Sequence, residues 1–256
     1  MTPRFHVGPV PGPGALIDLP PPATRHAQVL RLQPGDALCL FDGHGGQWRA
    51  ELDAMGRKAA RARVLAHEPI ERELPCAVTL ALGMPANERM DTLVEKATEL
   101  GVHAVQPLLC AHSVLRVAGE RAERKAAHWQ AVAAAACEQS GRNRVPVVAP
   151  VLSLAGWLST LAASAGSADG APSPLRLLLS LAPSALPLAR LPGLAQARGT
   201  LVLSGPEGGL QASEEAAALQ AGFVPVSLGP RVLRADTAPL AALAVLAAAL
   251  QAGGHP

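Results

Sequence analysis

Aromatic side chains are scarce in this sequence of 256 residues: they make up 2% of it, and tyrosine is absent. A core must therefore be built mainly from alanine, leucine and valine. Hydrophobic residues nevertheless make up 49% and charged residues 16%, a balance typical of a globular chain and not of a disordered one. At roughly 150 residues per domain, the length accommodates one or two domains.

Cysteine is also rare, and its spacing is wide. The four cysteines, Cys39, Cys76, Cys110 and Cys137, form no Cys-x-x-Cys pair, and the histidines lack the spacing of metal ligands. This distribution argues against a disulfide scaffold or a zinc ribbon and fits a reducing compartment. We therefore expect no bound metal and a cytoplasmic location.

Long apolar runs and a strong charge bias are both missing. The longest apolar run, Ala238–Leu250, is shorter than the ~20 residues that a membrane-spanning helix needs, and the first residues lack the order of a signal peptide. A formal net charge of +2 excludes a polybasic protein but allows a local RNA-binding face. Only three of the 22 basic residues are lysine, which leaves 19 arginines, so a single arginine carries little weight.

The N-terminal part of the chain has the pattern of short strands separated by turn signals such as Gln33-Pro34-Gly35-Asp36. Strands are predicted over residues 4–7, 37–41, 47–52 and 59–66, with one helix over 23–32. Many short strands and one small helix favour a β-barrel or a barrel-like module. Residues 67–75 carry two prolines and four charges among few apolar residues, and they are predicted to be a linker.

From Cys76 onwards the pattern changes to alternating strands and helices, which predicts an α/β fold with a parallel sheet covered on both faces. Residues 162–174 are rich in Ser, Gly, Ala and Pro and are expected to be a flexible surface insertion. The predicted strands are Ala77–Gly83, Val102–Leu108, one near Val147, Leu175–Leu181, Thr200–Ser204 and Phe223–Leu228. The predicted helices are Asn87–Leu100 with Asn87 as its cap, Glu120–Ser140, one from Ser153, Ser213–Ala221 with Ser213 as its cap, and Ala235–Leu250.

Three loops carry residues suited to chemistry, and the first is Ser204-Gly205-Pro206-Glu207-Gly208-Gly209, directly after a predicted strand. Its glycines let the backbone approach a ligand closely. Glu214 and Glu215 follow in the first turn of the next helix, where they oppose an anionic phosphate. The loop also fits neither the G-x-G-x-x-G nor the Gly-Lys-Ser/Thr nucleotide pattern. A plain strand–turn–helix connection remains an alternative.

The second loop, Leu228–Ala238, places Arg231 and Arg234 three residues apart at the entry of the last helix. The helix dipole disfavours cations there, and local rules are often broken at functional sites. Pairing of the two arginines with Glu207, Asp236 or other acids is the structural alternative. The helix that follows is apolar enough to favour a core or subunit-interface position.

The third loop, Cys137–Pro146, is polar and rich in arginine. Arg142 and Arg144 stand near a helix C-terminus, where the dipole favours cations in any case. Grouped with Glu138, Gln139 and Asn143, they offer contacts to base edges and to phosphates together.

Short blocks spread nearly end to end along the chain have a specific joint order and spacing. They are Pro3–Phe5, His26 with Val29–Leu32, Gly35-Asp36, Leu40–Gly43, Glu95–Val102, Glu138–Arg142 with Pro146, Gly205–Gly209 and Leu228–Arg234. In these blocks the chain resembles the RsmE-type 16S ribosomal RNA uridine N3-methyltransferases, which are members of the SPOUT class of S-adenosylmethionine-dependent enzymes. Two positions depart from the family pattern: Asp236 replaces a glutamate, and Arg89 replaces a lysine.

The resemblance implies a PUA-like RNA-binding β-barrel over residues 1–72 and a SPOUT methyltransferase domain over 76–254, with a trefoil knot and a homodimer formed near it. It also implies that S-adenosylmethionine binds at the knot. The expected cofactor-binding residues are Leu181, Ser204, Gly205, Pro206, Glu207, Gly208, Gly209, Leu228, Gly229, Val232, Leu233 and Arg234.

The implied reaction is attack of a uridine N3 on the sulfonium methyl group, with 16S ribosomal RNA of the small ribosomal subunit as partner. The catalytic candidates are Arg142, Glu207 and Arg234. Arginine is not a credible base, and Glu207, Glu138, Asp236 and His26 all stay open as proton acceptors. The expected RNA-binding residues are Arg4, His26, Arg31, Arg142 and Arg144.

Two other functions stay open on the sequence. One is a catalytically silent RNA-binding or ribosome-assembly factor on the same scaffold, which the departures at Arg89 and Asp236 favour. The other is a Rossmann oxidoreductase, which shares the alternating pattern but requires a dinucleotide fingerprint that the sequence lacks.

Overall fold

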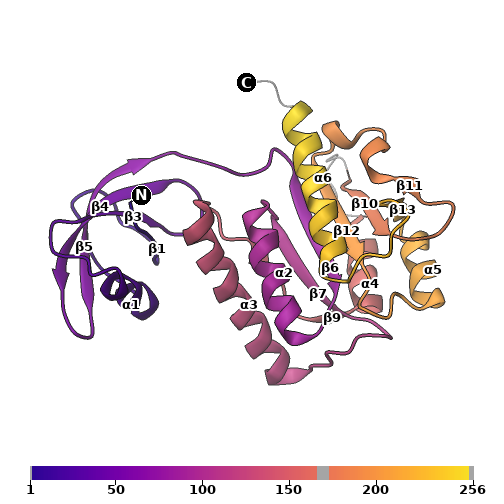
Figure 1. Cartoon of the computed structure of the whole chain (residues 1–256), viewed down its shortest axis with the longest axis horizontal. Coiled ribbons are helices and arrows are strands. Elements are labelled where there is room, and N and C mark those ends of the chain that lie inside the picture. Colours follow the sequence, from indigo (N-terminus) through magenta and orange to yellow (C-terminus); the bar gives the residue numbers. More distant parts are fainter. Residues whose placement is uncertain (1, 166–172, 254–256) are drawn as a thin grey trace. The chain divides into compact units, whose positions relative to one another are not determined.

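The computed structural model describes residues 2–165 and 173–253. The chain divides into two compact units (Figure 1). Unit 1 comprises Met1–Glu73 and Ala134–Val145, and unit 2 comprises Leu74–Ala133 and Pro146–Pro256. Unit 1 therefore includes a segment, residues 134–145, that is distant in sequence from the rest of the unit. The division into functional domains at residues 72–76 stays a prediction.

Unit 1 is built on a five-stranded sheet in the order β1-β3-β4-β5-β2. The pair β1–β3 is parallel, and the other pairs are antiparallel. Alternate residues of β5 (Ala60, Ala62 and Val64) are buried with Phe5 and Leu40, as the two-residue period of a strand requires. The elements are β1 (Arg4–His6), β2 (Leu16–Asp18), α1 (Pro21–Val29), β3 (Ala37–Phe41), β4 (Gln47–Met55) and β5 (Ala60–Glu68).

Helix α1 begins and ends two to three residues earlier than the predicted helix over residues 23–32. The helix begins at Pro21, because proline suits the first helical positions, where its missing N–H has no partner to lose. It ends at Val29, since Arg31 adopts the left-handed conformation with φ of 57°. The short strand β2 was missed.

The segment 134–145 is held to the rest of unit 1 by polar contacts. Asn143 Oδ1 accepts a hydrogen bond of 2.6 Å from Arg4 Nη2, and Asn143 Nδ2 donates to the carbonyl of Ile70 over 2.6 Å. The guanidinium of Arg142 is paired with the carboxylate of Glu73, to which both its Nε and its Nη2 donate. Because the Arg142 side chain is buried, this ion pair is shielded from solvent on the arginine side.

The substitution Arg142→Ala tests this attachment, because it leaves the Glu73 carboxylate without its partner. We expect a loss of about 3 kcal/mol in the free energy of unfolding of unit 1, measured by amide hydrogen exchange in β3 and β4. Arg144→Ala is the matched control, since Arg144 pairs with Glu71 over 3.2 Å at an exposed position and its loss costs less than about 1 kcal/mol. Equal losses in the two variants would contradict a structural role of the buried pair.

Unit 2 is built on an eight-stranded sheet in which every pairing is parallel, as predicted for an α/β fold. The strand order is β11-β13-β10-β12-β6-β7-β8, and β9 also pairs with β7. Parallel pairing brings the carboxyl ends of β13, β10 and β12 to one edge. The strands are β6 (Ala77–Gly83), β7 (Ala104–Leu109), β8 (Val147–Val148), β9 (Leu152–Ser153), β10 (Leu175–Leu179), β11 (Leu186–Pro187), β12 (Gly199–Ser204) and β13 (Val224–Ser227).

Helices cover both faces of this sheet (Figure 1). Helix α6 packs on β6, β12 and α2, whereas α4 packs on β7, β9 and α5. Trp157 and Phe223 belong to the apolar cluster that includes Leu178 and Leu203 of the central strands. The helices are α2 (Asn87–Glu99), α3 (Gly119–Ser140), α4 (Leu154–Ala165), α5 (Ala212–Gln220) and α6 (Thr237–Gly253), with short 3-10 turns η1 (Leu188–Arg190) and η2 (Leu194–Gln196).

Both predicted helix caps were wrong. The N-cap of α2 is Ala86, and the N-cap of α5 is Gln211, which forms a capping box with Glu214. In each case a glutamate carboxylate accepts a hydrogen bond from the backbone N–H of the N-cap residue itself. The Glu214 carboxylate accepts from Gln211 N over 2.9 Å, and the Glu207 carboxylate accepts from Ala86 N over 3.0 Å.

The predicted insertion at 162–174 falls largely outside the described residues. Its first part is helical, because α4 continues to Ala165. Within residues 2–165 and 173–253, no helix combines the length and the apolar character needed to cross a bilayer.

Candidate functional site

A cavity of about 710 Å³ opens at the carboxyl edge of the parallel sheet in unit 2. Its walls come from the loops after β10, β12 and β13, which are neighbouring strands of the sheet. A topological position of this kind is where open α/β sheets bind their ligands. The lining residues include Leu179, Ser180, Leu181, Ser204, Gly205, Pro206, Glu207, Gly208, Gly209, Leu210, Glu215, Val226, Leu228, Gly229, Arg231, Val232, Leu233 and Arg234.

The segment Ser204–Gly209, which we call the glycine loop, lies against the end of β6. A Cβ placed on Gly83 would lie 2.5 Å from Pro206 Cδ and 2.6 Å from Pro206 N. A Cβ on Gly205 would lie 3.0 Å from Leu210 N, so the loop is also folded tightly on itself. Close approach of the backbone therefore requires glycine at position 83, and a side chain on Gly205 would force the loop to shift by a few tenths of an ångström. Gly83 was missed in the sequence, where it appeared only as the last residue of a strand.

Glu207 ties the glycine loop to helix α2. Its Oε1 accepts a hydrogen bond from the backbone N–H of Ala86 over 3.0 Å and lies 3.4 Å from Arg89 Nη1. A carboxylate at a helix N-terminus is favoured by the dipole and satisfies an N–H that the helix leaves open. The sequence analysis considered Glu207 as an ion-pair partner of Arg231 or Arg234, but in the structure its carboxylate is paired with Arg89. In the sequence Arg89 was noted only as a departure from the family pattern.

The Leu228–Ala238 loop closes the cavity from the β13 side. Gly229 has φ of 106°, and its N–H donates to Ser227 Oγ over 3.1 Å, which turns the chain at the end of the strand. The carbonyl of Arg234 accepts from Thr237 N and Ala238 N, both over 3.0 Å, and thereby begins α6. Val232 is 81% exposed although it lines the cavity.

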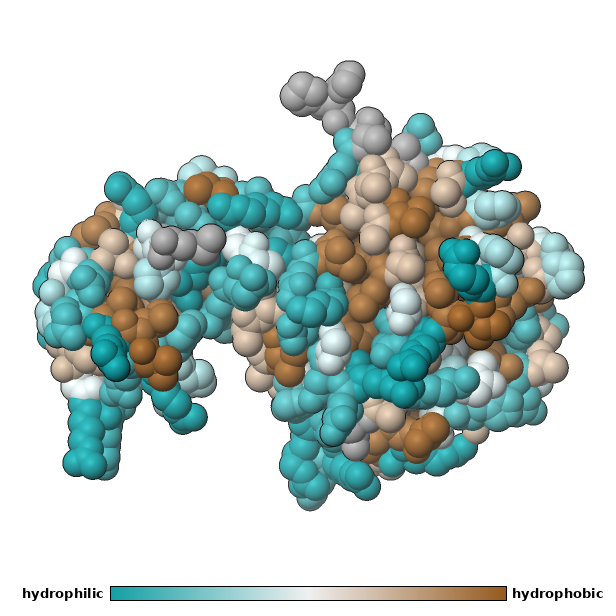
Figure 2. Space-filling model, viewed as in Figure 1, coloured by the Kyte–Doolittle hydropathy of each residue, from teal (hydrophilic) through white to brown (hydrophobic). Residues whose placement is uncertain are grey.

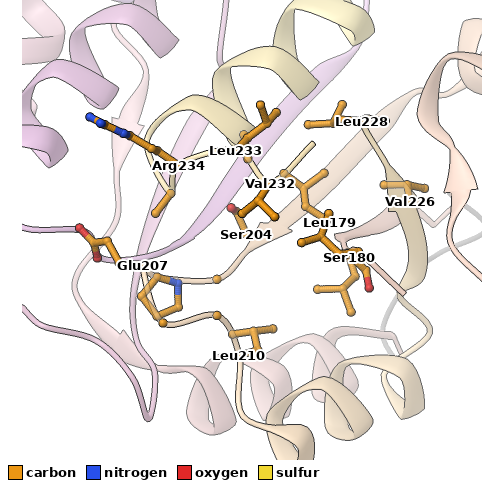
Figure 3. A pocket seen from close by; sticks show the side chains of 18 of the residues that line it. Leu179, Ser180, Ser204, Glu207, Leu210, Val226, Leu228, Val232, Leu233 and Arg234 are labelled. Carbon is orange, nitrogen blue, oxygen red and sulfur yellow. The ribbon is translucent and has the colours of Figure 1, made fainter. Parts of the chain in front are cut away.

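The two ends of the cavity differ in chemical character (Figure 3). Glu207 and Arg234 lie at one end, and the apolar side chains of Leu179, Val226 and Leu228 lie at the other. Glu215 adds a second carboxylate, whose Oε1 accepts from Ser180 Oγ over 3.2 Å. The cavity therefore combines an apolar wall with charges of both signs.

Cys110 lies close to these loops but is not a reactive thiol. Burial raises its pKa to about 12, and the carboxylate of Glu214 contributes to the shift. The thiol therefore stays protonated at neutral pH and is not available as a nucleophile.

All twelve residues expected to bind the cofactor line this one cavity. Of the three catalytic candidates, Glu207 and Arg234 line it as well, whereas Arg142 belongs to unit 1. Residues that line the cavity without having been predicted include Glu215, Leu210 and Val226. In the sequence these residues lie in apolar or helical segments, and nothing in such segments indicates a ligand contact.

The expected RNA-binding residues all belong to unit 1, where several of them make internal contacts. Arg4 donates to Gln47 Oε1 over 2.8 Å as well as to Asn143, and Arg142 is 3% exposed in its pair with Glu73. His26 Nδ1 lies 3.7 Å from a carboxylate oxygen of Glu138. Arg31 and Arg144 are exposed. A role of these five residues in RNA binding stays a prediction.

The substitution Gly83→Ala tests the close approach of β6 and the glycine loop. Its new Cβ must displace Pro206, so we expect the affinity for S-adenosylmethionine, the cofactor that the resemblance implies, to fall about tenfold or more. Titration calorimetry measures this affinity. Gly199→Ala is the matched control at the opposite end of β12, where the nearest atom to a new Cβ is 3.4 Å away. A folded Gly83→Ala protein with unchanged affinity would refute the argument.

Known protein families and known proteins are similar to this chain over most of its length. The model of an RNA methyltransferase domain matches residues 72–247, and the model of an RNA methyltransferase PUA domain matches residues 19–65. The chain is 36% identical over 225 residues to ribosomal RNA small subunit methyltransferase E of Synechocystis sp. The aligned residues make up 88% of this chain and 70% of that protein. The chain is 31% identical over 226 residues to the Bacillus subtilis protein of the same name, covering 85% and 84% respectively.

Solved structures agree with these sequence matches. The crystal structure of a ribosomal RNA small subunit methyltransferase E from Neisseria gonorrhoeae, bound to S-adenosyl methionine, matches with a TM-score of 0.85 and 37% identity over 95% of this chain and 96% of that chain. A putative methyltransferase from Legionella pneumophila, in complex with the same cofactor, matches with a TM-score of 0.87 and 31% identity over 97% and 98%. The predicted PUA-like module and α/β methyltransferase domain are confirmed. This chain belongs to the ribosomal RNA small subunit methyltransferase E family.

Proposed function

We propose that this chain transfers the methyl group of S-adenosylmethionine to N3 of one uridine in 16S ribosomal RNA of the small ribosomal subunit. The observation that carries the proposal is the cavity of about 710 Å³ in unit 2, where the loops after β10, β12 and β13 meet. Family membership supports the methyltransferase activity and the ribosomal RNA substrate. The choice of uridine N3 rests on the resemblance of the motifs.

The cavity fits S-adenosylmethionine in size and in chemistry. Its volume of about 710 Å³ lies within the range of small-molecule sites. Leu179, Val226 and Leu228 form an apolar wall that suits an adenine ring. The charged part of the lining has Glu207 and Glu215 beside Arg89, Arg231 and Arg234, which suits a ligand that itself carries charges of both signs. Because Gly205, Gly208 and Gly209 carry no side chains, the glycine loop can offer backbone N–H and C=O groups to a ligand.

S-adenosylmethionine, when bound, supplies an electrophilic methyl group. Uridine N3 carries a proton that must leave before the nitrogen has a lone pair for the attack. The guanidinium of Arg234 can donate a hydrogen bond to one of the two carbonyl oxygens beside N3 and so stabilise the anion that forms. Glu207 lies at the same end of the cavity, where its carboxylate can accept a proton directly or through a water.

Unit 1 is the RNA-binding part in this proposal. Its central region matches the PUA domain model, and Arg31 and Arg144 present exposed guanidinium groups. Arg142 is held by Glu73, so its part is to keep the loop that carries Arg144 in place. The substrate puts the activity in the cytoplasm.

We also propose a homodimer formed through α6, together with the trefoil knot of the SPOUT class. Between Thr237 and Leu250 the helix carries no charged residue, and Leu240 and Val245 are only half-buried. Figure 2 shows apolar residues gathered on unit 2 where α6 runs. A helix that is apolar on all sides is normally buried, and a second copy of the chain would bury it.

Light scattering should then give twice the mass of one chain, and a monomer would refute the dimer.

The decisive experiment supplies labelled S-adenosylmethionine and small ribosomal subunits from cells that lack this gene. We expect one methyl group per subunit, on N3 of a single uridine. Cofactor binding and RNA binding without methyl transfer would select the silent ribosome-assembly factor instead. Methylation of another atom would contradict the assignment to N3.

The substitution Arg234→Ala tests the role of the guanidinium. Loss of one donor that stabilises an anion lowers kcat by about a hundredfold. Arg234→Lys should restore part of the rate only, because an ammonium cannot donate in the same planar fork. The control is Arg190→Ala, which removes an exposed arginine in η1. A kcat for Arg234→Ala close to that of the control would remove Arg234 from the mechanism.

A further inference from the structure

His112 contacts the glycine loop although, among the described residues, it is not one that lines the cavity. Its Nδ1 lies 3.1 Å from the carbonyl oxygen of Gly208 and 3.2 Å from that of Gly209. A Cβ placed on Gly208 would lie 2.8 Å from His112 Cβ, so the side chain packs directly on the loop backbone. The contact thus combines hydrogen bonding with close packing at the middle of the loop.

The segment that carries His112 is itself held in place. The N–H of Ala111 donates to Glu214 Oε1 over 2.8 Å, while Glu214 Oε2 accepts from Gln211 N over 2.9 Å. Cys110 N donates to Ser113 Oγ over 3.0 Å, which closes a tight turn after β7. The 110–113 turn and the residues 208–211 are therefore joined at two points, one through Glu214 and one through His112.

The two carbonyl oxygens determine which ring nitrogen of His112 carries a proton. A carbonyl oxygen accepts hydrogen bonds and cannot donate one. Nδ1 must therefore carry the hydrogen for either contact to be favourable, in the neutral ring as well as in the charged one. A side chain that only packs against the loop has no such requirement.

We propose that His112 is a positioning residue: its Nδ1–H holds the carbonyls of Gly208 and Gly209 and so keeps the glycine loop in the shape that binds the methyl donor. This inference rests on the proposed function, because it assigns the loop to S-adenosylmethionine. Since His112 is exposed, its removal disturbs the loop with little effect on the core.

Three substitutions separate this role from simple packing. His112→Ala removes the donor, His112→Asn places an amide N–H close to the position of Nδ1, and His112→Gln places it one methylene farther away. We expect the Kd for S-adenosylmethionine to rise about five- to tenfold in the Ala and Gln variants and to return near the wild-type value in the Asn variant. The KM for this donor should follow the Kd, with a smaller change in kcat.

His103→Ala is the matched control, because His103 is an exposed histidine just before β7, at the other end of that strand. The rate of amide hydrogen exchange of residues 205–210, measured without any ligand, gives a second readout. This rate should increase in the Ala and Gln variants only. Equal Kd values and exchange rates in all variants overturn the inference, as does an Asn variant that behaves like Ala. A wild-type chain that binds no S-adenosylmethionine refutes the proposed function, while the exchange rates still decide whether His112 holds the loop.

Discussion

The site of unit 2 depends on the close approach of two backbone segments, the end of β6 at Gly83 and the loop at Pro206. Any side chain on Gly83 would occupy the space of Pro206. With the loop in that position, Glu207 reaches the N–H of Ala86 and the carbonyls of Gly208 and Gly209 reach His112. Contacts with α2 and with the turn after β7 thus follow from one missing Cβ, and together they shape one wall of the cavity.

Arginine serves two different purposes in this chain. Arg4 and Arg142 are engaged within unit 1, where they hold the segment 134–145 through Asn143 and Glu73. Arg231 and Arg234 line the cavity of unit 2. Residue type alone does not separate the two groups, since a guanidinium is equally suited to a buried carboxylate and to a ligand. The environment of each arginine makes the distinction.

Glutamate carries much of the long-range order around the site. Glu207, Glu214 and Glu215 each accept a hydrogen bond from another loop or helix end: from Ala86 N, Ala111 N and Ser180 Oγ respectively. Glu214 and Glu215 also argued from the sequence against a phosphate ligand, because they oppose negative charge at the start of α5. These two residues therefore have a structural effect, through their hydrogen bonds, and an electrostatic one at the start of α5.

The sequence by itself determined the alternation of strands and helices in unit 2, the short strands of unit 1, and the glycine- and proline-rich loops that line the cavity. These features are local, since they follow from side-chain periodicity and from residues that permit tight turns. Only the tertiary structure decided the roles of Gly83, Arg89, His112 and Glu207. Each of those depends on an atom more than twenty residues away or on the course of a neighbouring backbone, and a local pattern contains neither.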